Sequence, residues 1–524
     1  MTLMSRRGWL LLSGSIVFVA VLARVVPGPR IIDDAFITYR YTRNLLLGRG
    51  LVFNPGERVL GTTTPLYALL LAVLSLPLGG ASAPLPTLSP LLNALFDAGS
   101  CVLLLWLGKK LGSPIAGVVT AAIWAVTPMS VTFAIGGMET SLYVFLLLLS
   151  YLLYLNDQLV ALGAVLGLAF LTRPDALLLA VPIVLDACRR AFSPSEDRSF
   201  RRRLPPAVAA GLAVVMPWSV FSFLYYGSVV PNSLLAKRVA YRLPPGAALV
   251  RLLQQLGTPF FEDLTLGTRW IGVGLILYTF VCLLALVRTA KRSPRAWPGL
   301  VFPWFYCAVF AAANPLIFRW YLTPPLPFYI LSIVLGFRYL TADLGHLLQR
   351  LKVLERPPWL GRAGLTALAL VPFALSLRAW DLRPPNGPSR PAPDMASIQL
   401  ELVYAQAADY LLPQLRTGDQ IAAGDVGVLG YRTDALILDT VGLNTPGAVK
   451  YYPLPASMYV INYAVAPDFI LATRPRFVVI LEVYGRNGLL QDPRFLQSYT
   501  LEHTLPTDMY GSRGMLVFER KVRP

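Results

Sequence analysis

The chain alternates between apolar stretches of helical length and short polar segments. The apolar stretches lie at about residues 9–26, 64–79, 89–108, 113–134, 140–155, 158–172, 175–188, 206–226, 270–288, 298–313, 321–338 and 363–380. A helix that crosses the hydrocarbon core of a bilayer needs about 20 predominantly apolar residues. The pattern therefore predicts a polytopic α-helical membrane protein, in which the shorter stretches are kinked, re-entrant or packed against other helices.

Charge and cysteine content exclude several other classes of protein. Of the 524 residues, 55% are hydrophobic and 14% are charged, and the net charge is +18. The basic residues stand in short runs between apolar stretches, for example Arg6-Arg7, Lys109-Lys110 and Arg201-Arg202-Arg203. Such runs are typical of cytoplasmic loops, so we expect no nucleic-acid partner. Four cysteines without CxxC spacing and two histidines argue against a disulfide framework, a histidine metal site and a Ser-His-Asp triad.

The basic runs also predict the topology. With Arg6-Arg7 inside, Asp33 and Asp34 emerge outside, and two further crossings before Lys109-Lys110 would place that pair outside, against the positive-inside rule. We therefore expect 64–79 to lie at the outer interface or to re-enter, which leaves about 11 transmembrane helices. This topology places four polar clusters outside, at residues 136–140, 173–175, 226–237 and 314–321.

The character of the sequence changes after residue 380. A Pro/Arg-rich linker is followed by apolar runs that alternate with polar turns, and residues 397–412 have helical spacing. Short strands are predicted at 420–423, 435–439, 477–481 and 514–520. We predict a transmembrane domain over residues 1–380 and a soluble extracytoplasmic α/β domain over 381–524.

An acidic pair, Asp33-Asp34, stands just after the first apolar stretch. Adjacent carboxylates repel each other, and they suit a general base or ligands for a cation at a membrane surface. Tyr39 and Arg40 follow on a predicted amphipathic helix, where an arginine one to two turns on can hold a lipid phosphate. The alternatives are a solvated loop or a helix N-terminus, and a weak surface salt bridge for Arg40.

Two further outer clusters carry charge. Glu139 follows two glycines that allow a close approach of backbone, and its alternative role is to favour the start of the next helix. Arg173-Pro174-Asp175 interrupts apolar sequence, where charges are costly and either functional or mutually paired. A structural Arg–Asp clamp and a catalytic role are both open at this point.

The remaining candidates are cations and their neighbours in later loops. Asn232 and Lys237 stand in the largest outer loop, where Lys237 either binds phosphate as a point charge or snorkels at the interface. Arg319 and Tyr321 precede a proline-rich helix start, and Arg319 is either an interfacial anchor or a phosphate ligand.

Several of these motifs, in this order, resemble GT-C glycosyltransferases, and most of all the mycobacterial terminal arabinofuranosyltransferases that use decaprenyl-phosphate arabinose. The matching segments are Asp33-Asp34-Ala35-Phe36-Ile37-Thr38-Tyr39-Arg40-Tyr41, Gly50 to Glu57, Gly137-Met138-Glu139-Thr140, Leu171 to Asp175, Pro231-Asn232 with Lys237, Gly424 to Gly427 and Asp439 to Leu443. The resemblance covers most of the chain. It departs from the mycobacterial pattern at Thr62-Thr63-Thr64-Pro65 and at Asp175-Ala176, which leaves the sugar open more than the reaction.

The resemblance implies a GT-C fold and an inverting transferase of a bacterial plasma membrane. Its donor would be a polyprenyl-phosphate sugar, with arabinofuranose as the candidate, and its acceptor a cell-envelope glycan or glycoconjugate. Asp33 or Asp34 would be the general base on the acceptor hydroxyl, and Glu139 would assist the base or a metal. No cofactor is certain from the sequence, and a divalent metal at Asp34 and Glu139 stays open.

The rival class is a transporter or flippase for an anionic lipid or solute. Transporters of that kind show internal repeats and ionisable residues near the bilayer midplane. Here the acidic residues stand in loops on one predicted side, and the sequence shows no repeat of that kind. The sequence therefore favours the transferase.

Overall fold

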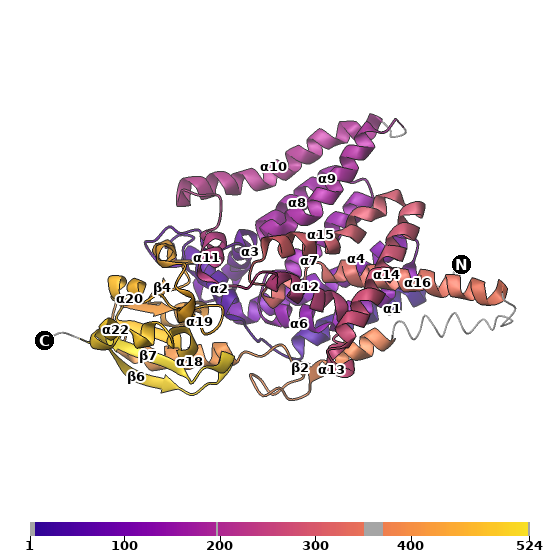
Figure 1. The fold of residues 1–524 in the computed structure, drawn as a ribbon. Helices are drawn as coiled ribbons and strands as arrows, with labels where there is room; N and C mark the ends of the chain where they lie inside the picture. The colour runs from indigo at the N-terminus through magenta and orange to yellow at the C-terminus, as the bar shows by residue number, and fades with distance from the viewer. Residues whose placement is uncertain (1–5, 195–197, 351–369, 522–524) are drawn as a thin grey trace. The chain divides into compact units, whose positions relative to one another are not determined.

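A computed structural model describes residues 6–194, 198–350 and 370–521 (Figure 1). These residues form two compact units, each built from three stretches of the chain. Unit 1 comprises Met1–Pro29, Ser89–Met216 and Gly246–Ala396, and unit 2 comprises Arg30–Leu88, Pro217–Pro245 and Ser397–Pro524.

In the described part of unit 1, the regular structure is helical apart from one two-residue strand pair, β1 (Trp380–Asp381) with β2 (Ala392–Pro393). Its helices are α1 (Arg6–Val25), α4 (Leu85–Lys110), α5 (Pro114–Val126), α6 (Pro128–Ile135), α7 (Thr140–Leu155), α8 (Leu159–Thr172), α9 (Leu177–Phe192), α10 (Arg198–Tyr226), α12 (Ala247–Gly257), α13 (Asp263–Leu266), α14 (Trp270–Arg292), α15 (Trp297–Ala313) and α16 (Leu326–Arg350). Short 3-10 turns η3 (Pro174–Ala176) and η5 (Arg319–Leu322) stand before α9 and α16.

Six of the described helices are long and apolar enough to cross a membrane, and a seventh span forms if the bent pair α5 and α6 is counted as one. The predicted number of about 11 is not confirmed. Three predicted crossings fold as shorter helices, α7, α8 and α9, of 16, 14 and 16 residues. The predicted crossing at 363–380 lies partly outside the described residues. The stretch at 64–79, expected not to cross, forms the 11-residue helix α3 (Pro65–Ser75).

A buried ion pair joins the N-terminal helices of unit 1. Arg24 Nε lies 2.7 Å from Asp97 Oδ2, and both side chains are almost fully buried. The guanidinium also donates to Ala125 O at 2.7 Å and Ser130 Oγ at 2.6 Å, and Ser141 donates to Asp97 at 2.9 Å. Charges inside an apolar bundle are costly unless they are paired and hydrogen-bonded. This network satisfies that condition and links α1, α4, α5, α6 and α7.

Small residues bring α8 and α10 close together. A Cβ on Gly163 would lie 1.9 Å from Ala207 O, so the backbones touch where only glycine fits. Gly167 and Gly211 continue the contact one turn on. Close approach through small residues is the usual way in which apolar helices associate in membranes.

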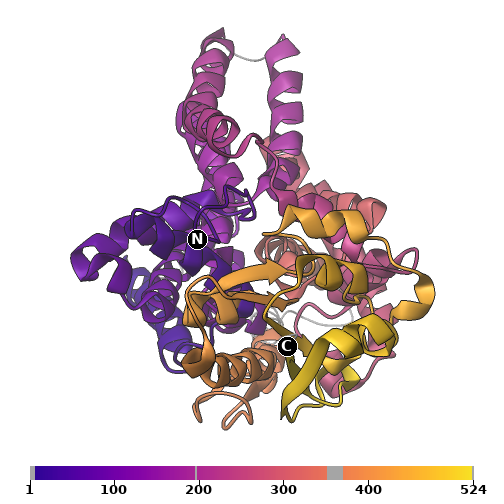
Figure 2. The ribbon, with the colours of Figure 1, turned by 90° about the vertical axis from the view of Figure 1, so that its left-hand side faces the viewer.

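Unit 2 contains a five-stranded mixed sheet in the order β4-β3-β5-β7-β6 (orange to yellow in Figure 2). Its strands are β3 (Gln420–Ala423), β4 (Leu436–Asp439), β5 (Phe477–Leu481), β6 (Tyr499–Leu505) and β7 (Met515–Arg520). β3 is parallel to β4 and β5, and β7 is antiparallel to β5 and β6. The four predicted strands are confirmed, and β6 is an addition.

Helices pack against this sheet from distant parts of the chain. From the C-terminal segment come α18 (Gln399–Leu411), α19 (Gly427–Thr433), α20 (Pro467–Thr473) and α22 (Pro493–Ser498); from earlier segments come α2 (Asp33–Leu46) and α11 (Asn232–Ala240). Tyr41, Leu51, Phe53 and Ala240 lie in the same hydrophobic core as the strands. The structure thus groups the chain differently from the predicted division at residue 380, because these buried side chains tie 30–88 and 217–245 to 397–524.

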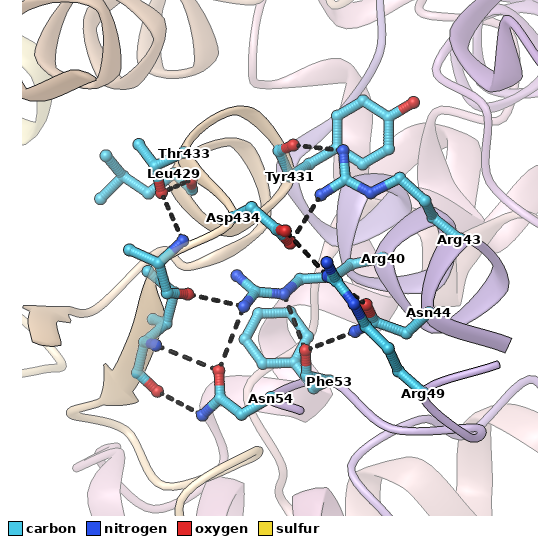
Figure 3. A network of polar contacts seen from close by, with 12 residues as sticks. Arg40, Arg43, Asn44, Arg49, Phe53, Asn54, Leu429, Tyr431, Thr433 and Asp434 are labelled. Carbon is cyan, nitrogen blue, oxygen red and sulfur yellow. Dashed lines mark hydrogen bonds and ion pairs between the residues drawn. The ribbon is translucent and has the colours of Figure 1, made fainter. Parts of the chain in front are cut away.

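A polar network fastens α2 and the loop after it to the β4 edge (Figure 3). Asn54 exchanges two hydrogen bonds with the backbone of Ile437: its Nδ2 donates to the carbonyl at 2.9 Å, and its Oδ1 accepts from the N–H at 3.0 Å. Arg40 Nε donates to Phe53 O at 2.7 Å, and Arg40 Nη2 donates to Ala435 O at 2.6 Å. β4 is an edge strand, and a side-chain amide here replaces the missing neighbour.

We predict that the side-chain amide of Asn54 stabilises the folded protein. Asn54→Ala leaves the backbone N–H and C=O of Ile437 buried without these partners, so we expect a loss of about 1–3 kcal/mol of unfolding free energy. Thermal unfolding of the purified protein in detergent checks this. Glu57→Ala is the control, because the exposed Glu57 takes only the other Nδ2 proton of Asn54. Equal effects of the two variants would contradict the pairing with Ile437.

Candidate active site

Asp33, the first residue of α2, is held by the backbone at the start of α19. Its carboxylate accepts from Gly427 N at 2.9 Å and from Val428 N at 2.8 Å, and the side chain is buried. A Cβ on Gly427 would lie 1.9 Å from Asp33 O, so only glycine fits there. Burial raises the pKa of Asp33 to about 6, the two backbone bonds act against this, and the charges of Asp34 and Asp439 add to it.

Asp34 is less buried than Asp33 and is not held by the backbone in the same way. It is half-buried, and within the described part of the chain its carboxylate has no hydrogen bond or ion pair. It is close enough to Asp33, Glu401 and Asp425 for its charge to raise their pKa values. Of the acidic pair, Asp34 is therefore the carboxylate that the fold leaves available to a ligand.

Glu401 and Asp425 complete an acidic group around the pair, and the sequence did not single them out as site residues. Glu401 accepts from the backbone N–H of Asp33 at 3.2 Å, and burial raises its pKa to about 7. Asp425 accepts from the Tyr404 hydroxyl at 3.1 Å, and burial raises its pKa well above the usual value. Asp425 stands in Gly424 to Gly427, a segment that the resemblance had included, whereas Glu401 had no signal beyond its place on an amphipathic helix.

The side chains of Arg40 and Tyr39 lie in the interior of unit 2. The guanidinium of Arg40 is fully buried, makes the contacts of the β4 network and lies 4.5 Å from the Phe53 ring centroid. Tyr39 is also buried, with Phe36 and Tyr431 in edge contact. These contacts give no support to the donor-phosphate role predicted for Arg40.

Asn232 has a structural contact of the same kind. Its Nδ2 donates to Leu443 O at 3.0 Å and also to Gly442 O, which fixes the start of α11 against the turn after β4. Lys237 stands one to two turns later and is half-buried. Asp439 forms that turn: its carboxylate accepts from Val441 N, Gly442 N and Asn444 N at 2.8–3.0 Å.

Unit 1 brings four predicted residues together. Arg173 Nε lies 3.0 Å from Asp175 Oδ1, and Arg173 Nη1 lies 3.5 Å from Glu139 Oε1. The guanidinium is 4.8 Å from the ring centroid of Tyr321, and Tyr306 donates to Asp175 at 3.1 Å. The loops before α7, α9 and α16 thus meet at one charged cluster. The Arg–Asp clamp that the sequence allowed is present, and Glu139 joins it.

Arg319 lines a cavity of about 430 Å³ in unit 1. Arg251 of α12 lines it too, and burial followed by the nearby charge of Arg319 lowers the pKa of Arg251. Gln255, on the same wall, has a buried Nε2 without a hydrogen-bond partner among the described residues. Asp263 and Asp394 also line the cavity, whose other walls include apolar side chains. Arg251 and Gln255 carried no sequence signal.

A metal has no evident site. In the described ranges, no group of three or more His, Cys, Asp or Glu side chains is arranged to hold an ion. Asp34 and Glu139 belong to different units. Metal binding at these two residues stays a prediction.

Comparisons with known proteins give two partial matches to family models. Residues 88–221 match the dolichyl-phosphate-mannose-protein mannosyltransferase family, and residues 393–518 match a domain of unknown function (DUF8728). Among curated proteins, a terminal beta-(1->2)-arabinofuranosyltransferase of Mycobacterium tuberculosis is 31% identical over 231 residues. That match takes in 40% of this chain and 35% of the relative, so it spans about a third of the relative's length.

Solved structures match over nearly the whole chain. The apo oligosaccharyltransferase of Archaeoglobus fulgidus has a TM-score of 0.59 at 12% identity, over 99% of this chain and 75% of that one. ArnT from Cupriavidus metallidurans, bound to undecaprenyl phosphate, has a TM-score of 0.57 at 14% identity, over 98% of both chains. The chain has the fold of these proteins, and together the matches confirm the resemblance to GT-C glycosyltransferases.

Proposed function

We propose that the protein is an inverting glycosyltransferase that moves a sugar from a polyprenyl-phosphate donor to a hydroxyl of a cell-envelope glycan or glycoconjugate. The observation that carries the proposal is the pair Asp33-Asp34, in which the fold uses one carboxylate and leaves the other available. The partial identity to an arabinofuranosyltransferase makes arabinofuranose the candidate sugar. The structural relatives in complex with dolichol-phosphate and undecaprenyl phosphate support a lipid-phosphate donor.

The proposed reaction requires few catalytic groups. A sugar that leaves a lipid phosphate departs with a stable anion, so little acid catalysis is needed at that oxygen. The acceptor hydroxyl needs a base, and its attack opposite the phosphate inverts the anomeric carbon. One available carboxylate and a set of cations that hold phosphate are sufficient for this reaction.

Asp34 is the base in this proposal, and Asp33 is the positioning residue. Asp34 has no hydrogen bond in the described structure that competes for its oxygens, whereas both Asp33 oxygens accept backbone N–H groups. The bonds of Asp33 fix the first turn of α2 and with it the direction of Asp34. Glu401 and Asp425 lie beside the pair, and burial raises the pKa of both.

Within unit 1 taken by itself, Arg319 is the predicted phosphate ligand that has a cavity beside it. Arg319 and Arg251 line one cavity with apolar walls, which fits a phosphate that carries a hydrocarbon chain. Gln255 supplies a buried N–H donor at the same wall. Arg173 is a weaker candidate, because Asp175 and Glu139 already neutralise it.

The first test separates the two aspartates. Asp34→Asn should lower kcat about 10²–10⁴-fold, the usual contribution of a general base, and should leave the unfolding temperature unchanged. Asp33→Asn should lower both activity and unfolding temperature, because an amide offers one oxygen where two N–H groups point. Purified protein with polyprenyl-phosphate arabinose and glycan acceptors provides the assay. Asp409→Asn, an exposed acid of unit 2, is the control. If Asp34→Asn transfers sugar at the rate of the control, the assignment fails.

A second test uses pH. Because burial raises the pKa of Asp33 and Asp439 to about 6 and of Glu401 to about 7, the folded protein holds protons that the unfolded chain releases at about pH 4. This contribution to stability is complete at low pH and is lost as pH rises through 6 to 7. Glu401→Gln should therefore raise the unfolding temperature at pH 8, and the gain should shrink towards pH 5. A gain that is independent of pH would contradict the buried, protonated state of Glu401.

The proposal places the reaction on the extracytoplasmic face of a bacterial plasma membrane. A cysteine at position 57 should react with an impermeant maleimide added to intact cells, and one at position 110 should react only after lysis. Both positions are exposed, and the exposed Cys188 is first replaced by serine. Labelling in the opposite pattern would invert the topology.

A further inference from the structure

A second cavity, of about 560 Å³, lies wholly within unit 2. One wall is α11 and the two residues after it, and the other is the loop 453–459. Leu235, Arg238 and Val239 are three and four residues apart on α11, so they present a single face to the cavity. Arg242 follows the end of the helix, after the extended Tyr241, and lines the same cavity. Among the described residues, no acidic side chain lines it.

The two arginines of this cavity are not neutralised. Within the residues that the structure describes, neither the Arg238 nor the Arg242 side chain has a hydrogen bond or an ion pair with a carboxylate. The contact given for the Arg242 guanidinium is the Tyr459 ring, with its centroid 6.0 Å away. The basic side chains of unit 2 elsewhere are often paired, as Arg43, Arg476 and Arg494 are. Two uncompensated guanidiniums on one wall attract an anion.

The walls of the cavity are fixed to each other. The backbone N–H of Arg242 donates to Asn462 O at 2.9 Å. Tyr459 accepts from Leu454 N at 3.3 Å and donates to Ala240 O at 3.5 Å. The arginines therefore stand on a framework that is already in place, which reduces the entropy lost when a ligand binds.

Tyr241 connects this cavity to the candidate base. It lines the cavity, and burial raises the pKa of its hydroxyl, with the charges of Asp425, Asp34 and Asp439 adding to the rise. Those carboxylates are thus within electrostatic range of a cavity wall. The geometry agrees, because the Tyr241 ring stands edge-on to the Tyr463 ring with centroids 5.9 Å apart, and Tyr463 lies beside Gly424, the residue before Asp425.

We propose that this cavity binds a negatively charged group, a phosphate or a carboxylate, carried by the acceptor glycan. The inference rests on the proposed function in one respect: it takes the molecule beside Asp34 to be the acceptor. Guanidinium groups pair with both kinds of anion, and the faces of Tyr241 and Tyr459 provide apolar surface with a polar edge for a sugar ring. The protein would then select acidic acceptors over neutral ones.

Direct binding is the first arm of the test. The probes are glucose, glucuronate and glucose 6-phosphate, which share a ring and differ in charge at one carbon, with inorganic phosphate as the free anion. The full-length protein in detergent should bind the two charged sugars more tightly than glucose, by saturation-transfer NMR. Arg238→Gln and Arg242→Gln should each weaken that binding on the order of tenfold and leave glucose unaffected. Arg416→Gln is the matched control, an exposed arginine of unit 2 outside the cavity.

Sugar transfer is the second arm, with acceptor glycans that carry a phosphate, a carboxylate or neither. The arginine variants should raise KM for the charged acceptors, leave kcat unchanged, and have no effect on the neutral acceptor. Equal binding of the three sugars, or variants that behave as Arg416→Gln does, would overturn the inference and leave the proposed function intact. Arginine-dependent binding without any transfer by the wild type would instead overturn the proposed function and leave an anion site. Inorganic phosphate that binds as tightly as glucose 6-phosphate would overturn the proposed role of the glycan.

Discussion

The contact between the Asp33 carboxylate and the backbone of Gly427 and Val428 is the constraint on which unit 2 depends. It joins the first turn of α2 to the first turn of α19 across 394 positions of sequence. The contact needs a carboxylate with two oxygens at 33, and it leaves no room for a side chain at Gly427. It also fixes the start of α2, which carries Asp34 and whose first backbone N–H, that of Asp33, donates to Glu401.

This arrangement gathers several buried carboxylates in one place, which costs free energy. Asp33, Glu401, Asp425 and Asp439 all have raised pKa values because they are buried, and for Asp33, Glu401 and Asp425 the like charges of neighbouring acids add to the effect. A fold selected for stability alone would not gather carboxylates in this way. Perturbed acids that cluster around one available carboxylate are typical of a site whose task is to move a proton. In unit 1, by contrast, buried charges are neutralised by ion pairs. Arg24 pairs with Asp97, and Arg173 pairs with Asp175 and Glu139.

The local elements could be predicted from the sequence, whereas their partners could not. Alternation and turn residues identify β3, β4, β5 and β7, and the helical spacing after Asp33 identifies α2. The same spacing put Arg40 on one face with Asp33, but it does not tell which face packs inward, and the guanidinium proved to lie in the core. Glu401 meets Asp33 through a bond between residues 368 positions apart, which no periodicity reveals. Hydropathy detects apolar helices of any length, and the number of crossings stays a prediction because α7, α8 and α9, of 16, 14 and 16 residues, are shorter than a usual membrane span.

The three-part construction of unit 2 has a consequence for biosynthesis. The acidic pair belongs to the first stretch of unit 2 to leave the ribosome, whereas Glu401 and Gly427, which bond to Asp33, belong to the last. Throughout most of translation the acidic pair therefore has none of the neighbours that hold it. A chain that stops before residue 397 would contain all six candidate membrane spans of the described residues and yet lack the backbone groups that hold Asp33.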